Sequence, residues 1–394
     1  MAQNKRRFVF NLVIILIVLI PVIMLVGWLL TPKKTTNILI VDKTVLTKDA
    51  YEHKGLIWTL KHRKYVKPDN NFYNLDEDYL GFFPKSDKQF EINDLKNLTL
   101  SQIDSISDTI NMVYYTDTYG IYHNEWYSDS LQSEHSKKVY GGLDIKDYEL
   151  LRKMKEKKKL ILSEFNLIAN PTSIAVRSKV ENLFGFQWTG WTLKYFESLD
   201  TATNHELPNW VINNFMEQHN GRWPYTKSGI VFVNEDETIF IMQNEDHLKH
   251  ETPIITSTTY AHEKYNIPAT INYPYWIDIN YVSDSVNTVL ANYNINTTDD
   301  GDSLLSYYNI PSRFPAVFAH TSNYQFYYFA GDFCDNEMPM ITTYFKGITW
   351  LKRWLMERSD LNNRELFFWN YYYPMIKVIM NDNYDQLKNS KKIN

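Results

Sequence analysis

The chain opens on one uninterrupted apolar run. Residues 8–30 read FVFNLVIILIVLIPVIMLVGWLL, a run of 23 residues without a charged side chain. A helix rises about 1.5 Å per residue, so this run reaches about 35 Å and is long enough to cross the hydrocarbon core of a bilayer. It exceeds the apolar region of a cleaved signal peptide and ends in GWLLTPKK rather than in small residues. The pattern therefore favours an uncleaved transmembrane signal anchor over a signal peptide.

Basic residues on both sides of the run indicate its orientation. Three precede it and two follow it, namely Lys5, Arg6, Arg7, Lys33 and Lys34. An excess of basic residues marks the cytoplasmic side of a membrane. We therefore expect a cytoplasmic N-terminus over residues 1–7, a single membrane span over 8–30 and an extracytoplasmic remainder, in a bacterial cytoplasmic membrane. The single cysteine, Cys334, is consistent with an oxidising compartment.

Beyond the anchor, apolar runs typical of buried strands alternate with segments of helical periodicity. The predicted strands cover residues 37–43, 111–115 and 160–165, and the predicted helices cover 51–65, 144–159 and 171–185. Strands that alternate with helices favour parallel pairing through right-handed crossovers. The sequence thus predicts an α/β fold with a mostly parallel sheet and flanking helices.

The second half of the chain is richer in strands. Further strands are predicted over residues 229–233, 238–242, 253–257, 317–319 and 325–330, and a helix over 344–357. The strands 317–319 and 325–330 are expected to form a pair with a turn near Asn323. Since no internal repeat or low-complexity linker interrupts the chain, we expect one domain over residues 31–335 and a C-terminal helical extension over 336–394.

Composition excludes several classes of function. The net charge is −5, hydrophobic residues make up 44% and aromatic residues 15%, which is typical of a folded protein and not of a nucleic-acid binder. Glycine is scarce, with 13 residues, and neither GxGxxG nor GxxxxGK[ST] occurs. HExxH and GxSxG are also absent from the sequence. We therefore predict no cofactor, no metal site and no serine nucleophile.

The ends of the first three predicted strands carry polar side chains, namely Asp42, Asp117, Glu164 and Asn166. Ligands of open parallel sheets bind beyond the carboxyl ends of the strands, so these residues are candidates for a site. Glu164 is interpreted either as a general acid or base or as a carboxylate that caps a helix or pairs with Arg177. For Asp42, an ion pair with Lys43 is the alternative to a catalytic role.

The segment 187–206, QWTGWTLKYFESLDTATNHE, concentrates aromatic and acidic residues. Its candidate ligand-binding residues are Trp188, Trp191, Tyr195, Asp200, Asn204 and Glu206, to which Asn166 and Arg177 are added from the neighbouring rim. Aromatic faces stack on sugar rings while amides and carboxylates bind hydroxyls, so the segment is suited to a polysaccharide. The alternative is that its aromatic residues belong to the core, where Trp and Tyr are usually buried.

Three stretches resemble the class I glutamine amidotransferase-like superfamily, which has a flavodoxin-like architecture. NILIVDK resembles its first strand, LILSEF followed by NPT lies where the family places its nucleophile elbow, and FPAVFAHTSNYQFYYFAGDF resembles the final strand pair of its non-amidotransferase relatives. The chain departs from the family in two places. Ser163–Glu164–Phe165 stands at the elbow in place of a cysteine between glycines, and Ser322 stands where the family's His-x-Glu spacing after His320 requires an acid. The resemblance therefore implies a degenerate member without the cysteine chemistry, similar to uncharacterised membrane-anchored envelope proteins linked to polysaccharide export.

Two functions from different classes follow. The first is a membrane-anchored, non-catalytic extracytoplasmic domain that binds an envelope polysaccharide or an envelope assembly partner. The second is a glycan-acting hydrolase in which Glu164 works with a second rim carboxylate, Asp117 or Asp42. The missing nucleophile motifs favour the first.

Overall fold

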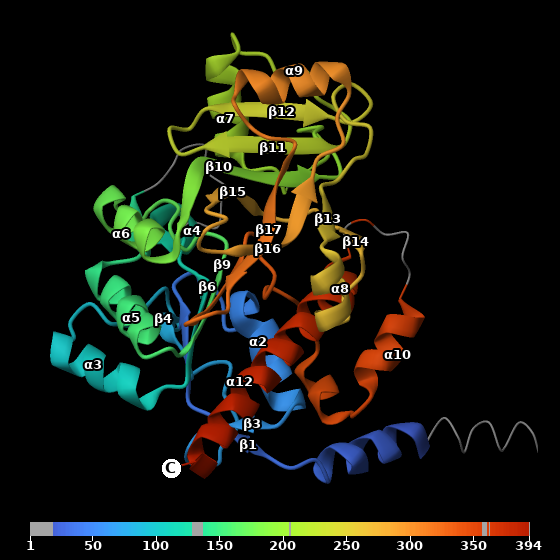
Figure 1. Ribbon diagram of the computed structural model, residues 1–394. Helices are drawn as coiled ribbons and strands as arrows, with labels where there is room; N and C mark the ends of the chain where they lie inside the picture. Colours follow the sequence, from blue (N-terminus) through green and yellow to red (C-terminus); the bar gives the residue numbers. More distant parts are fainter. Residues whose placement is uncertain (1–18, 128–136, 205, 357–360, 362, 394) are drawn as a thin grey trace, which may run out of the picture.

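A large mixed sheet forms the centre of the protein in the computed structural model, which describes residues 19–127, 137–204, 206–356, 361 and 363–393. Within these residues the sheet has ten strands (Figure 1). In spatial order they are β14 (Thr270–Asn272), β13 (Ile254–Ser257), β16 (Thr288–Asn294), β17 (Arg313–His320), β18 (Gln325–Phe329), β9 (Leu160–Glu164), β6 (Met112–Asp117), β2 (Ile38–Asp42), β4 (Leu80–Pro84) and β5 (Phe90–Asn93).

Only the middle of this sheet is parallel. Strands β18, β9, β6, β2 and β4 run parallel to their neighbours in that series, whereas β14, β13, β16, β17 and β5 pair antiparallel. The expectation of a mostly parallel sheet was therefore wrong, although the α/β class is confirmed. The four residues between β17 and β18 are too few for a crossover helix, which makes an antiparallel pair the available solution.

A smaller antiparallel sheet lies beside the large one, at the top of Figure 1. Its strands are β12 (Ile239–Gln243), β11 (Gly229–Asn234), β10 (Phe186–Phe196) and β15 (Ile277–Val282). Helices α7 (Asn209–Gln218) and α9 (Asp299–Tyr307) lie near it. Strand β10 occupies the first half of the segment 187–206, in which the sequence suggested an aromatic platform. Its apolar residues alternate with period two until the register shifts between Trp188 and Thr192.

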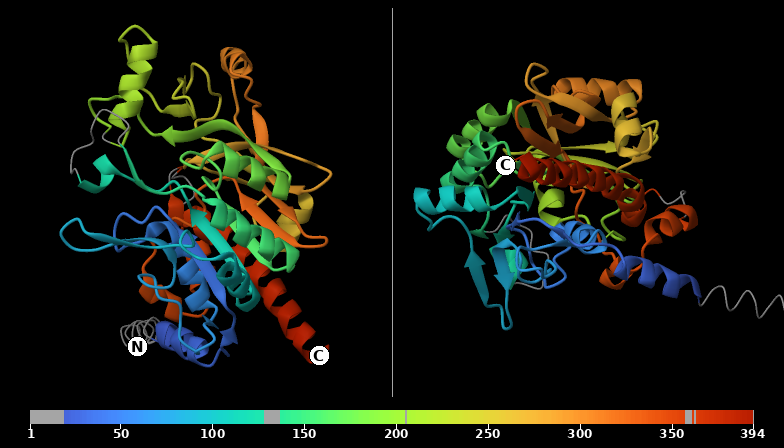
Figure 2. Two further views of the ribbon diagram at one scale, coloured as in Figure 1. Left: turned by 90° about the vertical axis from the view of Figure 1, so that its left-hand side faces the viewer. Right: turned by 60° about the horizontal axis from the view of Figure 1, so that its bottom comes forward.

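Helices cover both faces of the large sheet. Figures 1 and 2 show α3 (Leu100–Thr109), α5 (Ile145–Glu156) and α6 (Ile174–Phe184) together on one side, and α2 (Tyr51–His62), α8 (Thr259–Tyr265) and α12 (Tyr373–Ile393) on the other. The remaining elements are short: β1 (Lys34–Thr35), β3 (Tyr65–Val66), β7 (Ile121–Tyr122), α4 (His123–Tyr127), β8 (Lys138–Tyr140), a 3-10 helix (Met340–Tyr344), α10 (Ile348–Leu355), α11 (Arg364–Phe367) and a π-helical turn (Phe368–Tyr372).

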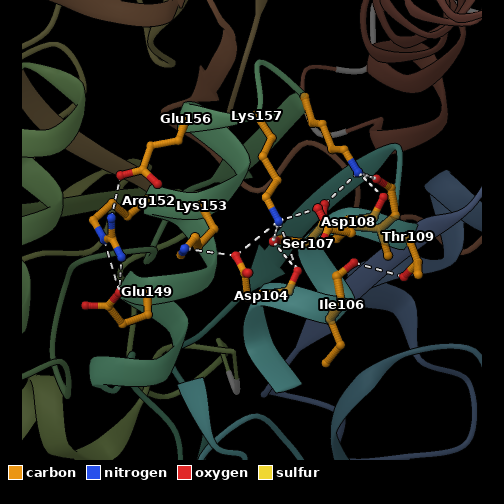
Figure 3. Close-up of polar contacts among 12 residues, drawn as sticks. Asp104, Ile106, Ser107, Asp108, Thr109, Glu149, Arg152, Lys153, Glu156 and Lys157 are labelled. Carbon is orange, nitrogen blue, oxygen red and sulfur yellow. Dashed lines mark hydrogen bonds and ion pairs between the residues drawn. The ribbon is translucent and has the colours of Figure 1, made fainter. Parts of the chain in front are cut away.

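A charged network joins α3 to the end of α5. Figure 3 shows Lys157 between two carboxylates of α3, with its Nζ 3.1 Å from Asp104 Oδ1 and 2.5 Å from Asp108 Oδ1. Lys153 also reaches Asp104, at 2.9 Å. These side chains are partly exposed, so solvent screens them and each pair contributes little to stability.

The C-terminal segment is helical, as expected, but it belongs to the core. Trp369, Tyr371 and Tyr372 of this segment are buried, and Trp58 of α2 packs edge-on against Trp369 at 4.9 Å between ring centroids. The described residues of this segment thus pack against the core and do not form a separate extension.

The first half of the predicted membrane span lies outside the described residues. Residues 19–29 are helical, and residues 8–18 belong to the part that the structure does not describe. Among the described residues, no helix combines the length and the apolar character that a membrane crossing requires. Trp28 at the end of this helix is buried, and its Nε1 donates a hydrogen bond to the carbonyl oxygen of His62 at 3.2 Å.

Candidate functional site

A cavity of about 600 Å³ opens beyond the carboxyl ends of β6 and β9, where they face the smaller sheet. Six aromatic side chains contribute to its wall: Tyr119, Tyr122, Phe165, Trp188, Trp210 and Trp276. Five carboxylates and one cation line it as well: Asp117, Glu125, Glu235, Glu237, Asp332 and Lys138. The amides of Asn166, Asn170 and Asn234 complete the polar lining. Mixed apolar walls with a few polar groups and a volume of about 300–1,000 Å³ are typical of small-molecule sites.

Asp117 lies at the end of β6 and is the predicted rim carboxylate that reaches the cavity. Its Oδ1 accepts a hydrogen bond from the backbone N–H of Tyr119 at 2.7 Å, which fixes the carboxyl group at the rim. Burial raises the pKa of Asp117 to about 7, and the nearby Asp42 adds to the rise. Near neutral pH this carboxyl group is therefore divided between its protonated and ionised forms.

Asp332 supplies a second carboxyl group to the cavity. It follows β18, and its Oδ2 lies 3.5 Å from the guanidinium of Arg364. Arg364 pairs more closely with Asp335, at 2.8 Å. Burial raises the pKa of Asp332, and the charges of Asp335 and Asp117 raise it further. Two carboxyl groups that both favour protonation thus share one cavity.

The sequence analysis did not select Asp332, although a signal was present. The residue stands in the Gly-Asp ending of FYYFAGDF, directly after a strand. Because β18 pairs parallel with β9, the rule that selected Asp117 and Glu164 also selects Asp332. The local pattern of the last two strands indicates only that they pair with one another, and the pairing of β18 with β9 joins segments far apart in the chain.

Glu164 does not line the cavity. Its carboxylate is buried, and Oε2 accepts hydrogen bonds from the backbone N–H groups of Phe333 at 2.9 Å and Cys334 at 3.0 Å. The hydroxyl of Tyr114 donates to the other oxygen, Oε1. Burial raises the pKa of Glu164. All these contacts hold the segment after β18 against β9, and they leave neither oxygen facing a ligand.

Asp42 is also buried and is occupied by a histidine. Its Oδ2 lies 2.6 Å from Nδ1 of His53, and its Oδ1 accepts the backbone N–H of Thr44 at 3.0 Å. The expected ion pair with Lys43 is not formed, because Lys43 Nζ binds Asp147 at 2.6 Å. Asp42 therefore does not line the cavity, and its charge raises the pKa of Asp117.

The aromatic residues of β10 point in different directions. Trp188 lines the cavity, and the guanidinium of Arg177 lies 4.7 Å from its ring. Arg177 in turn pairs with Glu235 of the cavity wall at 2.6 Å. Trp191 is turned away and packs edge-on against Phe240, 5.3 Å between centroids. The register shift after Trp188 separates the two indoles, so only one of them reaches the site.

The other candidates from the segment 187–206 have local roles. Tyr195 donates its hydroxyl to Glu251 Oε2 at 2.8 Å. Asp200 Oδ1 accepts the backbone N–H of Ala202 at 2.9 Å, and Asn204 accepts that of Glu206 at 2.8 Å. None of these predicted residues is part of the cavity lining within the described residues. Of the predicted ligand-binding set, Trp188 and Asn166 line the cavity and Arg177 supports its wall.

Two tryptophans of the wall had no sequence-level signal. Trp210 belongs to α7 and Trp276 directly precedes β15, and neither element was predicted. Trp276 lies parallel to Phe165, with ring centroids 6.5 Å apart and planes inclined by 9°. Tertiary packing thus brings together aromatic rings from β10, from α7 and from the residues that adjoin β9 and β15.

The described residues contain no group of three His, Cys, Asp or Glu side chains that could hold a metal ion.

No protein-family model matches the chain, and no curated protein matches it. Among solved structures, the chain is similar to a ThuA-like protein from Bacteroides uniformis, with 10% sequence identity and a TM-score of 0.36. The match covers 86% of this chain and 97% of the other. A TM-score this low bears neither on the fold nor on the function of the chain. The resemblance to the amidotransferase-like superfamily accordingly stays a prediction.

Proposed function

We propose that the protein is a membrane-anchored, extracytoplasmic module whose cavity binds a segment of an envelope polysaccharide without cleaving it. The observation that carries the proposal is the composition of the cavity wall. Tyr and Trp rings, carboxyl groups and amides together line a space of about 600 Å³. Such a wall offers flat apolar faces to the C–H side of sugar rings and hydrogen-bonding groups to their hydroxyls.

The charged groups of the lining restrict the classes of glycan that the cavity can bind. Five carboxyl groups and one lysine, Lys138, line the cavity, and although Arg177 pairs with Glu235 and Arg364 with Asp332, acidic groups outnumber basic ones in the lining. A polymer of uronic acids would meet like charge, whereas neutral sugars would not and amino sugars would be attracted. The proposed ligand is therefore a neutral or amino-substituted glycan. The anchor over residues 8–30 would hold the module at the membrane that such a polymer crosses or covers.

Calorimetric titration of the full chain in mild detergent tests the proposal. The probes are tetramers of glucosamine, of N-acetylglucosamine and of galacturonic acid. We expect binding of a glucosamine or N-acetylglucosamine tetramer and a loss of about tenfold in affinity for Trp276→Ala, which corresponds to about 1.4 kcal/mol. Tyr307→Ala is the matched control, because Tyr307 is 78% exposed and is not part of the wall.

Two outcomes contradict the glycan proposal. One is tighter binding of the galacturonic acid tetramer than of the other two probes. The other is an affinity that Trp276→Ala and Trp210→Ala leave unchanged while both variants retain the thermal unfolding midpoint of the wild type. Failure of all three probes to bind would favour an envelope protein as the partner.

Hydrolysis of the glycan is the second candidate function. It is favoured by Asp117 and Asp332, two carboxyl groups with raised pKa in one cavity. One protonated and one ionised carboxyl group are the requirement for glycosidic cleavage. In this reading Asp332 takes the role that the sequence analysis gave to Glu164, whose oxygens are occupied by Tyr114 and two backbone N–H groups.

Release of new reducing ends from the same tetramers distinguishes the two functions. If hydrolysis occurs, Asp117→Asn and Asp332→Asn abolish it, whereas Glu206→Gln, an exposed substitution outside the wall, does not. Binding without reducing ends supports the non-catalytic module.

A further inference from the structure

A buried arginine contacts one corner of the cavity wall, formed by Asn170, Trp188 and Glu235 and called here the Trp188 corner. Arg177 of α6 is 7% exposed, and it is not among the described residues that line the cavity. Its Nε donates to the carbonyl oxygen of Ile168 at 2.9 Å, and one Nη donates to Oδ1 of Asn170 at 3.3 Å. The other Nη pairs with Oε2 of Glu235 at 2.6 Å. One guanidinium thus fixes two polar groups of the wall.

The same guanidinium packs on the indole of Trp188. Its central carbon lies 4.7 Å from the ring centroid. Since Trp188 lines the cavity and Arg177 does not, the part of the indole that faces the cavity is not the part that Arg177 covers. The indole Nε1 donates to the carbonyl oxygen of Trp191 at 3.0 Å, which satisfies its N–H group. Trp188 therefore offers the cavity only apolar ring surface, of the kind that packs on the C–H face of a sugar.

Glu235 lies next to this ring and is also fixed through its backbone. Its N–H donates to the carbonyl oxygen of Gly190 at 2.8 Å, and its own carbonyl oxygen accepts the amide of Asn170 at 3.3 Å. Because Gly190 is two residues from Trp188 on β10, the first of these bonds places Glu235 beside the indole. Arg177 occupies Oε2, and within the residues that the structure describes Oε1 has no hydrogen-bond partner. The side chain is 38% exposed, so this second oxygen is an acceptor that a ligand can reach.

The ion pair leaves the Trp188 corner without net charge. A cation placed there would be repelled by Arg177 about as strongly as it is attracted by Glu235. The guanidinium also covers one face of the indole, which weakens the attraction of a second cation to the ring. A hydroxyl group, in contrast, needs only an oxygen acceptor, and Glu235 provides one. The corner is therefore suited to an uncharged ligand group.

We propose that the Trp188 corner binds one uncharged sugar unit of the glycan, neutral or N-acetylated, with its C–H face on the indole and a hydroxyl donating to Oε1 of Glu235. Arg177 is the positioning residue of this subsite. It holds the ring and the carboxylate in place, and it cancels the charge that would otherwise select a protonated amino sugar. The inference rests on the proposed glycan binding and narrows it, because a protonated amino sugar is then accepted only elsewhere in the cavity.

The test compares the affinities of two tetramers for the full chain in mild detergent, by calorimetric titration. The probes are the glucosamine tetramer, whose amines are protonated, and the N-acetylglucosamine tetramer, which is uncharged. Both are titrated at about pH 5.5, between the ordinary pKa of a glutamate carboxyl group and that of an amine. The measured quantity is the ratio of the glucosamine affinity to the N-acetylglucosamine affinity.

We expect Arg177→Gln to raise this ratio about tenfold, because Glu235 then attracts an ammonium group without opposition. Glu235→Gln should lower the ratio by a similar factor, because Arg177 is left without its counter-ion. The double variant Arg177→Gln/Glu235→Gln restores the net charge of the corner, so its ratio should lie within about threefold of the wild type. Arg152→Gln is the matched control, since Arg152 pairs with Glu149 on α5 at 2.7 Å, outside the wall, and the ratio should not change.

Trp188→Ala tests the stacking separately from the charge. It should lower both affinities about tenfold and leave their ratio unchanged, because the indole packs on the C–H face of either sugar. If thermal unfolding shows that Arg177→Gln does not fold, Glu235→Gln carries the charge test, because its side chain is partly exposed.

A ratio that neither Arg177→Gln nor Glu235→Gln changes, in a chain that binds the tetramers, would overturn this inference and leave the glycan proposal intact. Equal weakening of both tetramers by Arg177→Gln would overturn it as well, because Arg177 would then have only a structural role. If the wild type binds neither tetramer, the glycan proposal fails and this inference fails with it.

Discussion

Glu164 Oε2 accepts the backbone N–H of Cys334 at 3.0 Å, so that a carboxylate at the end of β9 holds the chain just after β18. The neighbouring N–H of Phe333 binds the same oxygen at 2.9 Å. Asp332 precedes these two residues and faces the cavity. The buried carboxylate of Glu164 thus fixes the position of the carboxyl group of Asp332 that lines the cavity, and Glu164 is a positioning residue for the site.

Removal of this carboxylate should destabilise the fold. Glu164→Ala leaves two buried N–H groups and the Tyr114 hydroxyl without their acceptor, and each unsatisfied group costs about 1–3 kcal/mol. We expect a loss of about 3 kcal/mol or more in the free energy of unfolding, measured by urea denaturation. Glu206→Ala, at an exposed position, should stay within about 0.5 kcal/mol of the wild type. Equal urea midpoints for both variants would contradict the anchoring role.

Asp117 should make stability depend on pH. Its pKa is raised by burial to about 7, against about 3.9 in the unfolded chain. Because the folded state holds the proton more tightly, this contribution to stability is fully present below about pH 4 and is lost as the pH rises through 7. Asp117→Asn lacks the titration, so the variant should gain stability relative to the wild type between pH 4 and 8, by up to about 4 kcal/mol. Urea unfolding across that range measures the difference, and a pH-independent difference would refute the assignment.

The buried pair of Lys43 and Asp147 should be sensitive to removal of one partner. The two groups are 2.6 Å apart, and Lys43 also donates to the carbonyl oxygen of Gly142 at 2.9 Å. Lys43→Met leaves a buried carboxylate without its counter-ion, which costs about 3–5 kcal/mol. Lys157→Met, in the partly exposed network of Figure 3, should cost less than about 1 kcal/mol. Equal losses of unfolding free energy for the two variants would show that burial of the Lys43–Asp147 pair does not make it more important for stability than the partly exposed network.

Gly55 should not tolerate a methyl group. A Cβ at this position of α2 would lie 2.4 Å from the carbonyl oxygen of Cys334, which itself accepts the Gly55 N–H at 3.1 Å. Gly55→Ala therefore pushes α2 away from the segment that carries Asp332, and overpacking of this kind costs about 1–3 kcal/mol. Gly27→Ala is the matched control, because its Cβ would meet only side-chain carbon atoms of Lys346, the nearer of them at 3.4 Å. Thermal unfolding of the two variants measures the contrast, and a stabilised Gly55→Ala would contradict the close approach.

Local patterns predicted six elements in the first half of the chain and missed β4, β5 and α3. The apolar runs of β2, β6 and β9 and the helical spacing in α2, α5 and α6 place these elements within a few residues of their observed bounds. Their alternation also predicts the parallel middle of the sheet, because each strand is followed by a helix that returns the chain. The rim position of Asp117 follows from the same reasoning.

Strand partners in the second half are chosen across long sequence distances. Periodicity predicts that β13, β17 and β18 exist, but the pairing of β18 with β9 over more than a hundred and fifty residues decides that Asp332 joins the rim. The register shift in β10 decides that Trp188 reaches the cavity and Trp191 does not, although both stand in the same motif.

The sequence by itself therefore determined the α/β class, the central strands and the presence of rim carboxylates, since these depend on local spacing and on strand ends. Only the tertiary structure decided which carboxylates are free to meet a ligand. The carboxylate of Glu164 accepts a hydrogen bond from the backbone N–H of Cys334, and that of Asp42 is hydrogen-bonded to His53. Neither partner is adjacent in the sequence. Asp117 and Asp332, in contrast, line the cavity. The physical reason is that a buried carboxylate must find hydrogen-bond donors, and those donors are supplied by whichever segment the fold brings alongside.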